Sequence, residues 1–326
     1  MTTVLVAALC SYLFLRALIP IFRRILLDRP NKRSSHHQPT PRGGGVSIVV
    51  ISSLCSIKAI IGGESETVIV LSLLATPLAI IGLIDDRLNL SAASRYFFQL
   101  LTAILMLSVS PLVVILVLNW SHSVLFLSFI LTLAAIAITA LINFANFMDG
   151  IDGLLAGCMA VIISALAISL HASWPLYALV GSILGFLCLN WNPAQVFMGD
   201  VGSTFLGALF AGLVLQASSW PVLISYVLVA TPLLGDASLC LIRRLLAGHR
   251  VSQPHRLHLF QRLHQAGWPQ SRVSLTYISA TALLAVAMLT GGLPLVLGLA
   301  CLQLYLGIWL DRHVAIPFAM ASNNFH

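Results

Sequence analysis

The sequence predicts an all-α fold, a polytopic membrane helix bundle that forms one domain over residues 1–326. Hydrophobic residues make up 59% of the chain and charged residues only 8%, compared with roughly 25% in soluble domains. The mean hydropathy is +0.99. The basic residues gather in alternate connections between apolar windows, which is typical of a chain that crosses a bilayer many times.

The apolar windows define the expected transmembrane helices, because a bilayer core about 30 Å thick requires about 20 apolar residues per helix. No basic stretch precedes the first window and no small-residue cleavage site ends it, so we interpret it as a span rather than a secretory signal. About eleven windows follow one another, at residues 3–22, 44–62, 67–84, 95–118, 123–143, 153–171, 174–191, 202–217, 221–246, 273–290 and 293–310.

The connections between the windows predict the orientation in the membrane. Basic residues cluster in residues 23–42, 87–95 and 243–272, whereas residues 62–67, 119–122, 171–174, 218–221 and 291–292 contain no Lys or Arg. The positive-inside rule then places the basic connections in the cytoplasm, the N-terminus outside and residues 311–313 inside. The formal net charge of +7 is consistent with this topology, because the basic loops would lie against anionic lipid headgroups. The charge does not indicate nucleic-acid binding.

The six cysteines all lie inside apolar windows, at no spacing typical of metal or redox sites. We therefore expect them to be buried packing residues. They are Cys10, Cys55, Cys158, Cys188, Cys240 and Cys301.

Acidic residues are informative because an Asp at mid-bilayer costs about 2.5–3.5 kcal/mol on insertion scales. Five of the ten acidic residues fall in the predicted cytoplasmic loops or at the helix ends beside them: Asp85, Asp86, Asp149, Asp152 and Asp200. Carboxylates on one membrane face predict a site for a hard cation such as Mg²⁺, which takes oxygen ligands from protein and substrate phosphates.

Simpler interpretations exist for four of these acids and for Asp236. Asp152 and Asp200 precede helical windows, where Asp is a common N-cap. Asp85 and Asp86 are also explained by a solvated helix end paired with Arg87, and Asp236 by pairing with Arg243 or Arg244. The shared location on one face favours a functional site.

Two basic loops are candidates for phosphate binding. Arg42 is followed by three glycines at the start of a helix, where backbone N–H groups can bind an anion. His255 and His258 flank Arg256, an arrangement suited to a diphosphate or a metal, although an interfacial amphipathic helix also explains it.

Five motifs in order resemble the polyprenyl-phosphate N-acetylhexosamine-1-phosphate transferases, a group of the glycosyltransferase family 4 type. They are DRPNKRSSHHQPTPRGGG (28–45), GLIDDRLNLSAASR (82–95), NFANFMDGIDGLLAG (143–157), NWNPAQVFMGDVGSTFLG (190–207) and PHRLHLFQRL (254–263). The resemblance implies a membrane bundle with an active-site cleft that faces the cytoplasm.

The resemblance also implies roles for individual residues. Mg²⁺, with Mn²⁺ as an alternative, is expected on Asp200 with Asn146. Catalytic roles are expected for Asp85, Asp86, Asp149 and Asp152. Substrate binding is expected from Arg33, His36, Arg42, Gly44, His255, Arg256 and His258.

The implied reaction moves a HexNAc-1-phosphate from a UDP-sugar to undecaprenyl phosphate in the bacterial inner membrane and releases UMP. Such a step initiates O-antigen, lipopolysaccharide or another envelope polysaccharide. Single displacement and a covalent intermediate on Asp85 or Asp86 both stay open. A homodimer is one option for the assembly, and a secondary transporter of an anionic solute is the alternative function.

The last loop, residues 254–263, departs from the family pattern at positions that bear on the choice of sugar. Many relatives have Asp-Arg-x-His-x-His-His in the last loop, whereas this chain has His255, Phe260 and Gln261 at the first and last two positions. This form resembles transferases of 6-deoxy sugars, and the apolar Phe260 favours UDP-FucNAc or UDP-QuiNAc over UDP-GlcNAc.

Overall fold

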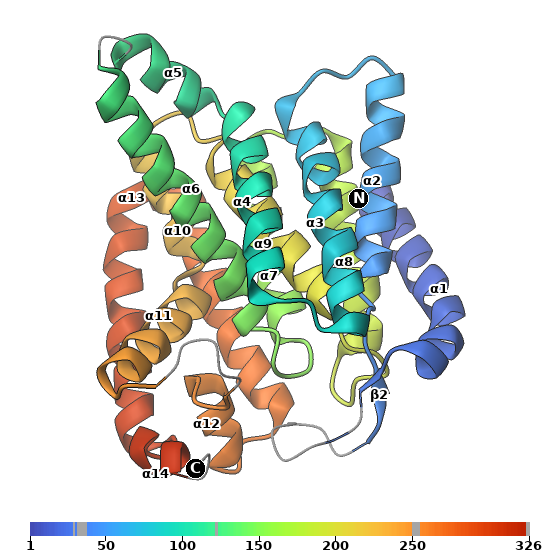
Figure 1. The fold of residues 1–326 in the computed structure, drawn as a ribbon, viewed down its shortest axis with the longest axis vertical. Coiled ribbons are helices and arrows are strands. Elements are labelled where there is room, and N and C mark those ends of the chain that lie inside the picture. The colour runs from blue at the N-terminus through green and yellow to red at the C-terminus, as the bar shows by residue number, and fades with distance from the viewer. Residues whose placement is uncertain (29, 31–37, 121–122, 250–254, 324–326) are drawn as a thin grey trace.

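The computed structural model describes residues 1–28, 30, 38–120, 123–249 and 255–323, and these form a helical bundle with one short strand pair (Figure 1). The elements are α1 (Thr2–Ile25), β1 (Leu27–Asp28), β2 (Thr40–Pro41), α2 (Val46–Ile61), α3 (Thr67–Leu88), α4 (Ala92–Ser108), α5 (Pro111–Trp120), α6 (Val124–Phe147), α7 (Leu154–Ser169), α8 (Trp174–Asn190), α9 (Asp200–Val214), α10 (Trp220–Val229), α11 (Thr231–Leu246), α12 (Leu259–Gln265), α13 (Gln270–His313) and α14 (Phe318–Asn323).

The helices confirm the all-α membrane class. Four described helices, α1, α3, α6 and α13, are long and apolar enough to cross a membrane, and six spans result if the bent pairs α4–α5 and α10–α11 count as one each. Four shorter apolar helices, α2, α7, α8 and α9, have 10–17 residues. Each expected window overlaps one of these helices or pairs, while the number of eleven spans stays a prediction.

The bends occur at residues that interrupt helical hydrogen bonding. Pro111 begins α5 after a 70° bend, and Pro232 lies in the first turn of α11 after a 77° bend. Proline lacks a backbone N–H, so it suits the start of a helix rather than its interior. Gly292 interrupts α13 with a φ of 59°, between the two windows that the sequence separates.

Helices α7, α8 and α9 form the interior of the bundle, and α9 is buried from Val201 to Val214. Small residues bring the helices close together. A Cβ at Gly181 or Gly185 of α8 would overlap the backbone of α1 at Val4 or Ala8. Close helix packing through small residues is typical of membrane bundles, where burial from water does not drive association.

Glycines also position the start of α9. A Cβ at Gly82 of α3 would lie 2.6 Å from the carbonyl carbon of Asp200. A Cβ at Gly45 would lie 2.6 Å from the Gly202 nitrogen. The ends of α2, α3 and α9 therefore meet in backbone contact, and the residues after Gly82 lie beside Asp200.

The two ends of the bundle differ in character. The strand pair, α12 and α14 lie at one end, and the α2–α3 connection and α5 lie at the other (Figure 1). At this second end, Glu66 accepts a hydrogen bond from the Ser173 N–H, and Glu64 accepts one from Trp174 Nε1. The two acidic residues of this end thus tie together the α2–α3 and α7–α8 connections.

Candidate active site

The structure brings the aspartates of α3 together with the start of α9. Asp86 accepts hydrogen bonds from the N–H groups of Asp200 (3.1 Å) and Val201 (3.4 Å). These N–H groups lack partners within a helix, and they carry the positive end of its dipole. Asp86 therefore caps α9 from a different helix.

Asp200 occupies the first turn of α9, and Gly199 at the N-cap has no side chain to cap the helix. Its Oδ1 accepts a hydrogen bond from Asn146 Nδ2 at 2.9 Å, and the same nitrogen donates to Ser203 Oγ at 3.0 Å. The carboxylate of Asp85 also interacts with Asp200. Asp200 is therefore held by side chains from α3 and α6 rather than acting as a cap.

Asp85 is buried although it ends a helix that reaches the bundle surface. Its Oδ1 accepts the Leu90 N–H at 2.5 Å, and its Oδ2 pairs with Arg95 Nη1 at 3.3 Å. The partner is thus Arg95 of α4 and not the neighbouring Arg87. Since both oxygens have a donor, the carboxylate is held in a defined orientation.

Asp149 lies in the connection between α6 and α7. Burial, together with the negative charges of Asp200 and Asp86, raises the pKa of Asp149 to about 8. Mutual repulsion of this kind favours the binding of a positive charge beside the carboxylates. A Cβ at Gly199 would overlap Asp86 Oδ2, so the glycine leaves room at the cluster. Asp86, Asp200 and Asn146 are joined by hydrogen bonds at the start of α9, and carboxylate and amide oxygens are the ligand type that a hard divalent cation such as Mg²⁺ takes.

A cavity of about 320 Å³ opens at this cluster. Asp85, Asn146, Asp200, His255 and His258 line it, which brings five of the expected site residues into one space. Gln261 of the altered last loop lines it too, and sequence reasoning missed the polar residues of α4, α6 and α9 that also line it: Arg95, Tyr96, Gln99, Asn143 and Thr204. A polar residue inside an apolar window is the signal that points to Gln99 and Asn143, which bond to each other through their amides at 2.7 and 3.2 Å.

Other expected residues lie around the cavity. Asp152 is buried, and its Oδ2 accepts hydrogen bonds from Asn192 Nδ2 (2.9 Å) and the Ala194 N–H (3.0 Å), so it supports the α8–α9 connection. The Gly44 N–H donates to the Phe197 carbonyl at 2.9 Å, which commits this group to the protein rather than to a phosphate.

Arg42 donates to Asp28 Oδ2 at 2.8 Å, and its charge also acts on Asp86 and Asp200. It therefore supplies a cation near the carboxylate cluster. Arg33 and His36 lie outside the described residues.

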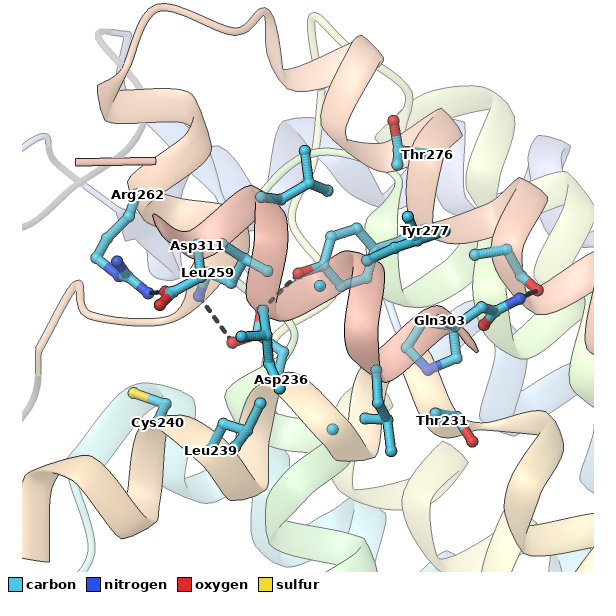
Figure 2. Close-up of a pocket in the computed structure, with 18 of the residues that line it drawn as sticks. Thr231, Asp236, Leu239, Cys240, Leu259, Arg262, Thr276, Tyr277, Gln303 and Asp311 are labelled. Carbon is cyan, nitrogen blue, oxygen red and sulfur yellow. Dashed lines mark hydrogen bonds and ion pairs between the residues drawn. The ribbon is translucent and has the colours of Figure 1, made fainter. Parts of the chain in front are cut away.

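The last loop is anchored by Asp236 of α11. Its carboxylate accepts hydrogen bonds from the N–H groups of Leu259 (2.7 Å) and Phe260 (3.0 Å) and from the Tyr277 hydroxyl (2.7 Å), and Figure 2 shows it between Leu259 and Tyr277. Asp236 thus fixes α12 rather than pairing with Arg243, which bonds Asp311 at 2.7 Å. A second cavity of about 200 Å³ lies on this side of Asp236.

His258 faces the other side of this anchor and lines the main cavity. Its Nδ1 lies 3.5 Å from Asp236 Oδ1. Although burial opposes the charge, Asp236 outweighs it and raises the pKa of His258 to about 9. Burial, together with the positive charges of His258 and Arg244, lowers the pKa of His255 to about 3. The cavity therefore has one cationic and one neutral histidine, and Arg256 is not one of the described residues that line it.

The fold and site define a membrane-embedded enzyme that combines a carboxylate cluster with cationic side chains, as a reaction between two phosphate compounds requires. The sequence profile of Glycosyl transferase family 4 matches residues 68–218. The chain is 30% identical over 294 residues to a probable undecaprenyl-phosphate N-acetylglucosaminyl 1-phosphate transferase of Bacillus subtilis, which covers 82% of this chain and 79% of that protein.

Two further relatives are named as transferases of the same kind. An undecaprenyl-phosphate alpha-N-acetylglucosaminyl 1-phosphate transferase of Yersinia pestis is 30% identical over 305 residues, 86% of this chain and 82% of that protein. A decaprenyl-phosphate N-acetylglucosaminephosphotransferase of Mycobacterium leprae is 30% identical over 325 residues, 83% of this chain and 78% of that protein. The chain belongs to the polyprenyl-phosphate N-acetylhexosamine-1-phosphate transferase family, which places it among multi-pass bacterial membrane transferases rather than transporters.

Proposed function

We propose that the protein transfers a HexNAc-1-phosphate from a UDP-sugar to undecaprenyl phosphate in a Mg²⁺-dependent reaction that releases UMP. The observation that carries the proposal is the cluster of Asp85, Asp200 and Asn146 at the cavity, with Asp86 bonded to the Asp200 N–H, in a chain of this family. The product would begin an O-antigen, lipopolysaccharide or other envelope polysaccharide.

The metal would be held by Asp200 and by the amide oxygen of Asn146, with Asp86 and Asp149 close by. The amide nitrogen of Asn146 is committed to Asp200 and Ser203, which leaves its oxygen as the ligand atom. When bound, Mg²⁺ neutralises the donor diphosphate and stabilises the departing UMP. Mn²⁺ suits the same oxygen ligands.

The lipid phosphate needs orientation more than deprotonation. A phosphate monoester has a second pKa near 6, so it is largely dianionic at neutral pH. Arg95 lines the cavity beside Asp85 and can pair with this dianion, while Asp85 fixes the guanidinium. Both oxygens of Asp85 already accept hydrogen bonds, which favours an orienting role and a single displacement over a covalent intermediate on this residue.

The donor diphosphate would contact His258, which also lines the cavity. With a pKa of about 9, His258 is an imidazolium at neutral pH and can pair with a phosphate oxygen. His255 is neutral and can serve as a hydrogen-bond partner for the donor. Arg256, which follows His255 in the same loop, would supply a further cation for the donor diphosphate.

The sugar preference depends on the altered last loop. His255 and Gln261, two of the three changed positions, line the cavity. The third, Phe260, is buried, and its ring stacks on His258 at 5.5 Å. Phe260 would therefore act through His258 rather than touch the hexose. Because the named relatives use N-acetylglucosamine, UDP-GlcNAc is the reference donor, and a preference for UDP-FucNAc or UDP-QuiNAc is the finer proposal.

The site would face the cytoplasm, with the N-terminus outside. Arg23 and Arg24 end α1, and Arg243 and Arg244 end α11, at the end of the bundle that has the strand pair and α12 (Figure 1). The positive-inside rule then places this end in the cytoplasm, where UDP-sugars are made available to the enzyme.

The test is to incubate the purified protein with undecaprenyl phosphate, Mg²⁺ and either UDP-GlcNAc, UDP-QuiNAc or UDP-FucNAc, and to measure UMP release. We expect UMP only when lipid, sugar nucleotide and metal are all present. UMP release without the lipid would indicate hydrolysis instead of transfer, and no release with any donor would refute the proposal. Faster turnover with UDP-GlcNAc would refute only the 6-deoxy preference.

A further inference from the structure

A second cluster of potential metal ligands includes His255 and His258, the two histidines that line the main cavity. Cys240 of α11, His255 and His258 each offer one atom, and these three atoms lie within 4.8 Å of one another. Figure 2 shows Cys240 one turn after Asp236 on the same helix, and an i, i+4 pair shares one helix face. Since Asp236 anchors the histidine loop, it brings the loop to the thiol.

An unsatisfied polar atom marks this cluster. His258 Nδ1 is buried and has no hydrogen-bond partner among the described residues. Asp236 Oδ1 lies 3.5 Å away, too far for a short hydrogen bond. Leaving a buried nitrogen without a partner costs roughly 1–3 kcal/mol, so an added ligand on this side would be stabilising.

The atom types select the metal. One sulfur and two imidazole nitrogens form a typical set for zinc, whereas Mg²⁺ requires oxygen ligands. Zinc bonds of about 2.0–2.3 Å in a tetrahedron place neighbouring ligand atoms roughly 3.5 Å apart. The distances between the ligand atoms therefore have to shorten by up to about 1.3 Å, which rotation of the side chains can supply.

The surrounding charges suit a dication. Binding converts the Cys240 thiol to a thiolate and the His258 imidazolium to a neutral imidazole, and it releases both protons to solvent. The thiolate and the Asp236 carboxylate together balance a charge of +2, which offsets repulsion from the buried Arg244. His255 is neutral, and its Nδ1 accepts only a 3.3 Å hydrogen bond from the Leu257 N–H, so a lone pair is present. A carboxylate beside a metal-binding histidine is a common supporting arrangement.

We propose that Cys240, His255 and His258 form a binding site for a thiophilic divalent cation of the zinc class, distinct from the carboxylate cluster. Both histidines also line the main cavity, so a metal bound to them withdraws them from the donor diphosphate. Occupancy of this site therefore inhibits transfer. The inhibition rests on the proposed function, whereas the binding does not.

Binding is tested with Co²⁺ as a spectroscopic probe of the purified full chain. A thiolate–Co²⁺ charge-transfer band reports Cys240, because Co²⁺ at the carboxylate cluster has only oxygen ligands and lacks this band. We expect the band in the natural protein and in Cys158→Ala, a matched change at another buried cysteine, and its loss in Cys240→Ala and Cys240→Ser. A band that persists in both Cys240 variants, or no band in the natural protein, overturns the site.

Inhibition is tested by UMP release at fixed Mg²⁺ with rising Zn²⁺. Loss of one ligand is expected to raise the half-inhibitory Zn²⁺ concentration by about 10-fold or more, since even residues that only support a ligand contribute 10–100-fold to affinity. Cys240→Ser should show this shift with normal turnover before zinc is added, and Cys158→Ala should not. Equal zinc sensitivity of Cys240→Ser and the natural protein would refute inhibition through this site. If no variant releases UMP, the proposed function fails, while the Co²⁺ band still decides the metal site.

Discussion

Gly199→Ala tests whether the packing of Asp86 against the start of α9 is required for activity. Gly199 has a φ of +74°, and its Cβ would overlap Asp86 Oδ2 and lie 3.1 Å from Asp86 Cγ and 2.9 Å from the Gly43 nitrogen. Gly63 is a matched control, because it has a φ of +88° and nothing within 4 Å of its Cβ.

The two effects of the substitution have different magnitudes. A positive φ disfavours alanine at both positions, and Gly199 (φ 74°, ψ 171°) lies in a region that is essentially restricted to glycine, so Gly199→Ala should lose roughly 1–3 kcal/mol of stability or more and Gly63→Ala less. Only at Gly199 must a carboxylate of the site move, by about 1 Å. A misplacement of this size can lower a rate by about 10²-fold. We therefore expect Gly199→Ala to be the less stable variant, and turnover to be lost only in Gly199→Ala when both variants are folded.

The assay compares thermal unfolding in detergent with the rate of UMP release. Gly63→Ala should keep near-normal turnover, and Gly199→Ala should fall by about 10²-fold at a temperature where both are folded. Similar activity of the two variants would show that Asp86 does not need its position against the Asp200 and Val201 N–H groups. That result would refute the arrangement of the carboxylate cluster as the source of catalysis.

Three further predictions concern charge and topology. Asp200→Asn keeps the size of the side chain but removes the charge that a hard cation requires, so UMP release should fall by at least about 10²-fold with normal membrane insertion; full activity would exclude a ligand role. Asp236 raises the pKa of His258 from 6.5 to about 9, so the stabilisation that the His258 charge contributes is fully present below pH 6.5 and is lost as the pH rises through about 9. Asp236→Asn should therefore move the alkaline limit of turnover and of thermal stability towards pH 6.5. An unchanged pH profile would contradict the pairing of Asp236 with His258. Cysteine labelling of intact cells from outside should reach position Ser65 and not Gly248, and the reverse pattern would place the site on the wrong face.

The helices were predictable because their cause is local. A run of about 20 apolar residues has to satisfy its backbone internally in a bilayer, and a helix does this with hydrogen bonds within the same segment. Each expected window accordingly overlaps a helix or a bent pair, and Gly292 separates the last two windows. The bends at Pro111 and Pro232 could be read from proline chemistry, although their angles of 70° and 77° could not.

The site was predictable in its members and not in its contacts. The sequence predicted Asp85, Asp86, Asp149, Asp152 and Asp200 on one membrane face, because an acid in mid-bilayer is unfavourable. It could not show that Asp86 caps α9, that Arg95 pairs with Asp85, or that Asp152 holds the α8–α9 connection. These partners are separated by tens of residues, or lie in helices whose rotation about their axes the sequence does not specify.

The sequence by itself determined the membrane class, the helical segments and the family, because apolar length, charge placement and motif order are properties of the chain. Only the tertiary structure decided that the Cys240 thiol, which the sequence indicates as a packing residue, meets His255 and His258. It did so through Asp236, whose carboxylate binds the loop between α11 and α12 by two backbone N–H groups. Contacts of this kind depend on how helices rotate and pack, and that is set by all their neighbours together.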